Sequence, residues 1–157
     1  MTNDNETPWI QLDGPYLDIL SLRGDGLCCS QIVVKLILKD LGRDNPDLVR
    51  AMAALCFGSG GSCGVLTGAL CALSAGLEGG PDRERPDPLL PLLVDELVGW
   101  FSLKTERAYG GSSCERILEA SPDKRACTML LIATLEKLQS MLASTTNPEK
   151  GHGHGHP

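Results

Sequence analysis

The sequence has no histidine outside its C-terminal segment, GHGHGHP, which holds His152, His154 and His156. The rest of the chain therefore contains no Cys-His or Ser-His-Asp constellation and no mixed Cys/His zinc site, unless the tail folds back. Ordinary hydrolase chemistry is excluded on this ground. The tail could bind nickel, zinc or copper, but three histidines at a chain end are as readily a solvated tail or a purification remnant. We assign no function to it.

Basic runs and long apolar runs are also missing. The formal net charge is -6, and the Lys and Arg residues are scattered without aromatic partners, so we expect no nucleic-acid partner. The first fourteen residues carry early acids and no apolar run, which differs from a secretory signal, and no stretch approaches membrane-spanning length. We expect a cytoplasmic protein with no membrane partner.

No alternating strand pattern occurs, and apolar residues recur at helical intervals instead. With 157 residues and 42% hydrophobic content, the chain is long enough for one domain with its own core. We predict a single-domain, all-α, antiparallel bundle of about five to six helices over residues 15–144. Flexible segments are expected at 1–14 and 145–157, and a linker at 78–88. The predicted helices are 27–41, 46–57, 64–77, 89–109, a short one holding Cys114, and 122–144, and residues 15–22 could form a further short helix.

The chain contains seven cysteines but no C-x-x-C pair, so local spacing indicates neither a zinc ribbon nor a thioredoxin-type site. Because the cytosol is reducing, a set of structural disulfides is disfavoured. Metal, cluster or redox chemistry gains weight, and any sulfur site must be assembled by the tertiary fold. Cys56 and Cys71 lie on apolar helical patterns and are predicted to fill the core.

Cys63 lies where a glycine-rich loop runs into an apolar helical pattern, in FGSGGSCGVLTGAL at residues 57–70. Unpaired backbone N–H groups and the helix dipole favour a thiolate at a helix start, so we expect the pKa of Cys63 to fall below that of a free thiol. The loop lacks the Lys-Ser/Thr ending of a P-loop, which argues against nucleotide binding. Small residues such as Gly64 and Gly68 should let a neighbouring helix approach closely.

Over residues 26–142 the sequence resembles the redox-active proteins named for their C_GCAxxG_C_C cysteine pattern. The first cysteine corresponds to Cys29 in Cys29-Ser30-Gln31, and the second is Cys63, with Val65 where the family usually has Ala. The third and fourth correspond to Cys114 and Cys127. Cys28, Cys56 and Cys71 fall outside the pattern, and the Cys28-Cys29 doublet leaves open which sulfur faces the site. The resemblance implies redox activity carried by cysteines and names no reaction.

Three functions follow as alternatives. In the leading one, Cys29, Cys63, Cys114 and Cys127 converge between helices, and the Cys63 thiolate starts a dithiol–disulfide cycle with a protein redox partner, making the chain a thiol-dependent oxidoreductase. In the second, the same four thiolates ligate an iron–sulfur cluster or zinc. Gly61, Gly64 and Gly68 are the candidate cofactor-binding positions beside them. In the third, the chain is a non-catalytic helical subunit of a redox complex whose cysteines are mainly core residues.

Overall fold

The computed structural model describes residues 14–57, 61–77 and 84–146, and these residues form helices and connections without strands. The prediction of an all-α protein is confirmed. The eight helices in the described residues exceed the expected five to six, partly because the single helix predicted over 46–57 is broken at Met52 and Ala53. The helices are α1 (Gly14–Gly24), α2 (Cys29–Asp40), α3 (Pro46–Ala51), α4 (Ala54–Phe57), α5 (Gly64–Gly76), α6 (Leu90–Tyr109), α7 (Cys114–Ala120) and α8 (Arg125–Thr146).

Local sequence signals define several helix ends. Asn45 caps α3, because its side-chain oxygen accepts the N–H of Leu48 at 3.0 Å, and Pro46 takes the first helical position. Gly42 and Gly110 follow α2 and α6 with φ values of +67° and +72°, in the left-handed region that ends many helices. These caps lie where the sequence predicts helix ends.

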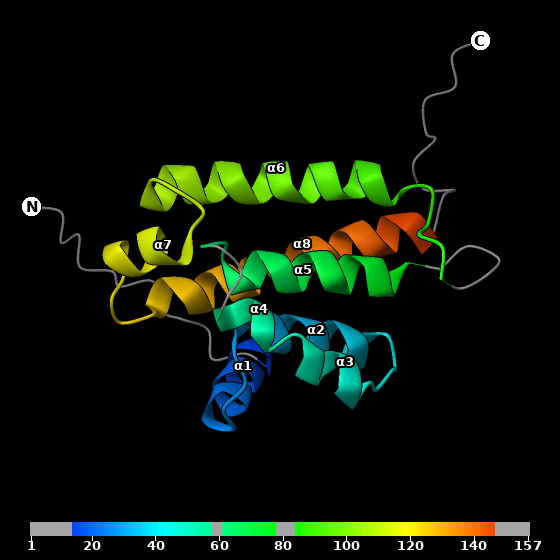
Figure 1. Cartoon of the computed structure of the whole chain (residues 1–157), viewed down its shortest axis with the longest axis horizontal. Coiled ribbons are helices and arrows are strands. Elements are labelled where there is room, and N and C mark those ends of the chain that lie inside the picture. Colours follow the sequence, from blue (N-terminus) through cyan, green and yellow to red (C-terminus); the bar gives the residue numbers. More distant parts are fainter. Residues whose placement is uncertain (1–13, 58–60, 78–83, 147–157) are drawn as a thin grey trace, which may run out of the picture.

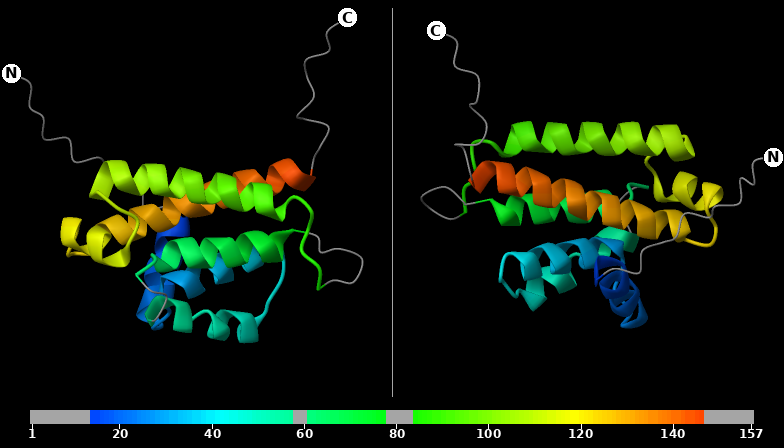
Figure 2. Two further views of the ribbon diagram at one scale, coloured as in Figure 1. Left: turned by 45° about the horizontal axis from the view of Figure 1, so that its top comes forward. Right: turned by 180° about the vertical axis from the view of Figure 1, so that it is seen from behind.

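Helices α2, α5 and α8 form the centre of the molecule, with α6 along one side and α1, α3 and α4 along the other (Figures 1 and 2). Helices α2 and α5 make the closest approach. A Cβ atom added to Gly68 would lie 2.7 Å from both the Cα and the carbonyl oxygen of Ser30, so only glycine fits at this crossing. The expected close helix contact is therefore present at Gly68.

Helix α8 differs from one expectation of the sequence. By length and composition it could cross a membrane, although no stretch of that length was expected. In the fold, 44% of its most apolar window is buried against other helices, and core helices of soluble proteins pass the same test. A single such helix is weak evidence for a membrane span. Helix α8 also continues to Thr146, past the predicted end at residue 144.

Several predicted features lie outside the described residues. They are the N-terminal segment up to residue 13, loop residues 58–60, residues 78–83 of the predicted linker, and the tail from residue 147 with its three histidines.

Candidate functional site

A cavity of about 410 Å³ is lined by residues at or near the starts of α2, α5, α7 and α8. These helix starts lie at one end of the bundle, on the left in Figure 1. The lining of the cavity holds five of the seven cysteines, which are Cys28, Cys29, Cys56, Cys114 and Cys127. These residues are separated by up to about a hundred positions in the sequence and come from different helices or helix ends. The tertiary fold therefore gathers sulfur atoms, as the sequence required.

Two of these cysteines form a disulfide. The sulfurs of Cys28 and Cys56 lie 2.20 Å apart, with a Cα–Cα distance of 6.4 Å. Both residues fall outside the four-cysteine pattern, and the prediction that Cys56 fills the core was wrong. Cys28 immediately precedes α2 and Cys56 lies in the short helix α4, so neither is a buried core residue. Because the chain turns between α3 and α4, Cys56 of α4 lies beside Cys28 at the start of α2.

Ser30 places its backbone N–H and its hydroxyl beside the sulfur of Cys56. Its backbone N–H donates to the Cys56 Sγ at 3.4 Å, and its side-chain Oγ lies 2.9 Å from the same sulfur. This N–H belongs to the first turn of α2, where backbone donors have no partner within the helix. With the disulfide formed, the hydroxyl donates its single hydrogen to the carbonyl oxygen of Met52 at 2.8 Å. Ser30 is completely buried, so these donors have fixed positions.

Cys63 is placed as predicted, directly before α5, but its environment differs from the expectation. The residue is only 5% exposed, and burial raises the pKa of its thiol to about 11. The backbone N–H groups of Val65 and Leu66 act in the opposite direction, as the helix-start argument required, but they are outweighed. The prediction of an activated thiolate at Cys63 was therefore wrong, because desolvation exceeds the effect of the helix terminus.

Three cysteines of the four-cysteine pattern line the cavity as free thiols. Cys114 is exposed, whereas Cys29 and Cys127 are half-buried. Cys114 begins α7, and its N–H donates to the carbonyl oxygen of Gly61 at 3.1 Å, which ties α7 to the loop before α5. A β-bridge between Ser62 and Ser113 strengthens this connection.

The electrostatics link the same set of thiols. Burial raises the pKa of Cys127, as do the nearby Cys29 and Cys114, whereas Arg23 and Lys124 lower it. Cys29 and Cys114 also raise the pKa of Cys63. Cys29 and Cys114 thus interact electrostatically with both Cys63 and Cys127, and Cys63 is the one cysteine of the pattern that does not line the cavity.

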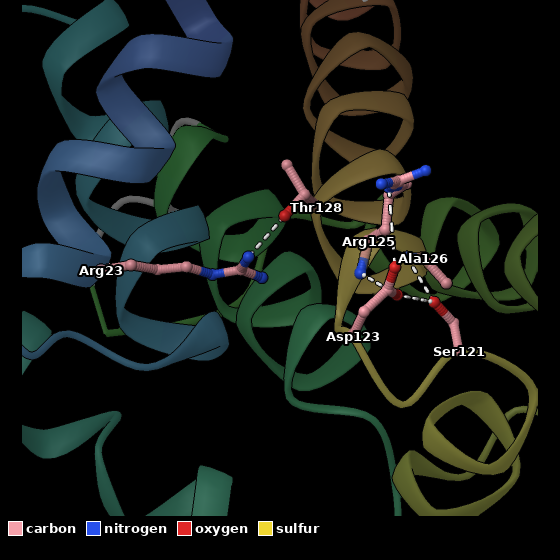
Figure 3. A network of polar contacts seen from close by, with 6 residues as sticks. All are labelled: Arg23, Ser121, Asp123, Arg125, Ala126 and Thr128. Atoms are coloured by element: carbon pink, nitrogen blue, oxygen red, sulfur yellow. Dashed lines mark hydrogen bonds and ion pairs between the residues drawn. The ribbon is translucent and has the colours of Figure 1, made fainter. Parts of the chain in front are cut away.

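The start of α8, which carries Cys127, is held by a polar network (Figure 3). The carboxylate of Asp123 accepts the hydroxyl of Ser121 at 2.7 Å and the N–H of Arg125 at 3.1 Å, and these bonds lower the pKa of Asp123. Arg23 of α1 donates a hydrogen bond to the hydroxyl of Thr128, the residue that follows Cys127. These contacts position both Cys127 and the Arg23 guanidinium at the cavity.

The thiols do not fit a metal site as they are arranged. In the described parts of the chain, no group of three or more His, Cys, Asp or Glu side chains is arranged to hold a metal ion. Cys29, Cys63, Cys114 and Cys127, the predicted ligands, are free thiols but are not grouped in this way, so the four-thiolate set that a cluster or a structural zinc requires is not formed among the described residues.

The three glycines assigned to cofactor binding have different surroundings. A Cβ on Gly64 would lie 3.3 Å from the Cys56 Sγ, so this glycine lets α5 approach the disulfide. Gly68 packs against the backbone of Ser30, which is a helix-packing role. Gly61 has a φ of +91° and open space around its Cα, and its carbonyl holds α7.

Cys71 lies on α5 and does not line the cavity. It is half-buried beside the hydrophobic core, and burial raises the pKa of its thiol. These surroundings suit the core role that the sequence predicted.

The sequence missed the Cys28–Cys56 pair and the two cations near Cys127. The available signal was the doublet at residues 28 and 29, which left open which sulfur faces the site, and both residues line the cavity. Spacing alone could not identify Cys56 as the partner, because the two are 28 residues apart.

Residues 27–141 match the family described as putative redox-active protein (C_GCAxxG_C_C), and the match includes all seven cysteines. No curated protein matches the chain, and no solved structure does.

Proposed function

The chain belongs to the C_GCAxxG_C_C family of redox-active proteins, and we propose that it carries out thiol–disulfide exchange with Cys28 and Cys56 as its primary redox couple. One observation carries this proposal. The disulfide opens into a cavity in which three free thiols, those of Cys29, Cys114 and Cys127, line the same space. A disulfide beside free thiols can pass its oxidising equivalents on by exchange.

The surroundings of Cys56 indicate which sulfur leaves. Exchange is faster when the departing sulfur is stabilised as a thiolate, and the Ser30 N–H and hydroxyl are positioned for Cys56. We therefore assign Cys28 as the sulfur that is attacked. A thiolate of an external dithiol attacks the Cys28 Sγ, forming a mixed disulfide, and Cys56 leaves as a thiolate that then takes a proton. The second thiolate of the dithiol then attacks the dithiol's first sulfur in the mixed disulfide, which releases Cys28 as a thiolate. Two electrons pass to the protein, and the dithiol becomes a disulfide.

The cavity thiols extend this couple. The sulfur of Cys114 is the most exposed of the three, so it is the best placed to meet a mixed disulfide on Cys28. Cys63 is a poor nucleophile at neutral pH, because its thiol remains protonated. In this proposal Cys63 is a buried structural residue, and Cys29, Cys114 and Cys127 are the exchanging thiols.

A cytoplasmic location is part of the proposal. Disulfides in the cytosol are usually transient and catalytic or redox-sensing, because cellular thiols reduce them. A Cys28–Cys56 disulfide at a solvent-open cavity suits that behaviour better than the role of a structural cross-link.

The test is residue-resolved thiol counting of the native protein without its histidine tail. We expect stoichiometric dithiothreitol to reduce Cys28 and Cys56 reversibly. Alkylation and peptide mapping should show that these two residues are the first to become newly reactive thiols. Cys28→Ser and Cys56→Ser should each abolish the two-thiol change, whereas Cys71→Ser, the matched control, should retain it. A protein whose Cys28 and Cys56 remain unreactive until it unfolds would refute the proposal and favour a non-catalytic helical subunit.

A further inference from the structure

The cavity beside the disulfide has a charge opposite to that of the protein. Among the thirteen described residues that line it are two cations, Arg23 and Lys124, and no Asp or Glu. The whole chain has a formal net charge of -6. Two other cavities of the described chain contain carboxylates, such as Asp18 in both. The absence of acids from the sulfur cavity is therefore a local feature of this site.

Both cations line the cavity together with Cys127. Arg23 lies in the last turn of α1 and is oriented by its hydrogen bond to Thr128 (Figure 3). Lys124 directly precedes α8. Both lower the pKa of the Cys127 thiol, so their positive field reaches the Cys127 sulfur at the cavity. A substrate with a negative group beside its sulfur would find opposite charge here.

The size and remaining lining suit a small molecule. A volume of about 410 Å³ lies in the range of small-ligand sites, which begins at roughly 300 Å³. Apolar surface comes from Leu27, Leu118 and Phe57, and Phe57 is 86% exposed next to Cys56. A short aliphatic thiol could contact this surface while its anionic end faces the cations.

We propose that the cavity takes a small thiol carrying a carboxylate as the electron donor to the Cys28–Cys56 disulfide, with Arg23 and Lys124 binding the carboxylate. This inference rests on the proposed exchange function. The donor thiolate attacks the Cys28 sulfur, a donor–Cys28 disulfide forms, and Cys56 leaves as a thiolate. A second donor thiolate attacks the donor sulfur of that mixed disulfide and releases the Cys28 thiolate. Two donor thiols thereby supply two electrons and leave as one small disulfide, and each protein thiolate takes a proton from water.

The probes are three small thiols of similar size and different charge: 3-mercaptopropionate, 2-mercaptoethanol and cysteamine. For each thiol, the rate at which it reduces the Cys28–Cys56 disulfide is divided by the rate at which the same thiol reduces a neutral small disulfide, that of 2-mercaptoethanol. This ratio corrects for the intrinsic reactivity of the thiol. We expect the anionic thiol to be preferred over the neutral one by about fivefold, and the cationic thiol to be the slowest. Raising the salt from low ionic strength to about 0.5 M should remove most of the preference.

Two variants assign the preference to the cations. Lys124→Asn removes one charge, and asparagine tolerates the φ of +61° at this position. Arg23→Gln removes the other. Each should reduce the preference by about half or more, and the double variant should abolish it. Lys35→Gln on α2 is the matched control, because Lys35 is exposed and lines a different cavity.

The outcomes separate this inference from the function beneath it. Equal corrected rates for the three thiols, with dithiothreitol still reducing the disulfide, would overturn the inference and leave the exchange function standing. Reduction by a dithiol protein alone, with all three small thiols inert, would also overturn it and assign the cavity to a protein partner. Failure of every reductant, dithiothreitol included, would overturn both.

Discussion

Replacing Ser30 by alanine should make the Cys28–Cys56 disulfide harder to reduce. The hydroxyl lies 2.9 Å from the Cys56 Sγ and 3.5 Å from the Cys28 Sγ, so a thiolate on Cys56 is the better placed acceptor. In the disulfide the sulfur is a weak acceptor and the hydroxyl donates to Met52, but a Cys56 thiolate would be a strong acceptor. The Ser30→Ala change removes stabilisation from the reduced state while the oxidised state loses only its Met52 bond.

The size of the effect follows from the energy of a hydrogen bond to a charged group. Such a bond contributes about 1.5–3 kcal/mol, and we take the lower end because the hydroxyl must leave Met52 or be shared. For a two-electron couple, about 1.4 kcal/mol corresponds to about 30 mV. We therefore expect the reduction potential of Ser30→Ala to be about 30 mV more negative than that of the wild type. The comparison is best made near pH 9, where an ordinary thiol, with a pKa of about 8.5, is largely ionised.

The assay is equilibration with buffers of reduced and oxidised dithiothreitol, followed by alkylation and peptide mapping of Cys28 and Cys56. Thr105→Ala is the matched control, because Thr105 is equally buried and its hydroxyl bonds the Phe101 carbonyl away from the cavity. It should lose stability without a change in potential. A Ser30→Ala potential equal to that of the wild type, or more positive, would refute the assignment of Cys56 as the stabilised leaving sulfur.

The remaining predictions concern stability and thiol titration. Gly68→Ala should lower the free energy of unfolding by about 2–3 kcal/mol in urea titrations, because its Cβ would meet backbone, whereas a change of the exposed Gly99 of α6 to Ala should raise it by about 1 kcal/mol; equal effects would contradict the packing argument. Thr134→Val should stabilise the protein by about 1 kcal/mol, since the buried Thr134 hydroxyl has no hydrogen-bond partner among the described residues; a loss of stability would reveal one. Cys63 should alkylate far more slowly than exposed Cys114 at pH 8 and gain rate only toward pH 11. Its folded pKa is raised, so the stability it contributes is complete below about pH 9 and is lost as pH rises through 11, and stability independent of pH in that window would contradict the burial.

Local patterns were sufficient for the helices and for most of their ends. Apolar periodicity predicted helices from α2 to α8, and Asn45-Pro46, Gly42 and Gly110 mark ends where the backbone requires a cap or a positive φ. Such signals act within a few residues, so they survive without knowledge of the fold. The break between α3 and α4 was missed, because the apolar spacing continues across it.

The sequence by itself determined that this is an all-α protein of the C_GCAxxG_C_C family, because apolar residues recur at helical intervals and the cysteine pattern spans the helices. It also determined that Cys63 begins a helix. Only the tertiary structure decided that Cys28 pairs with Cys56 and that burial raises the pKa of Cys63 to about 11. It alone placed Arg23 and Lys124 at one cavity. Desolvation, disulfide geometry and the field of a distant cation depend on which helices meet, and no local spacing contains that information.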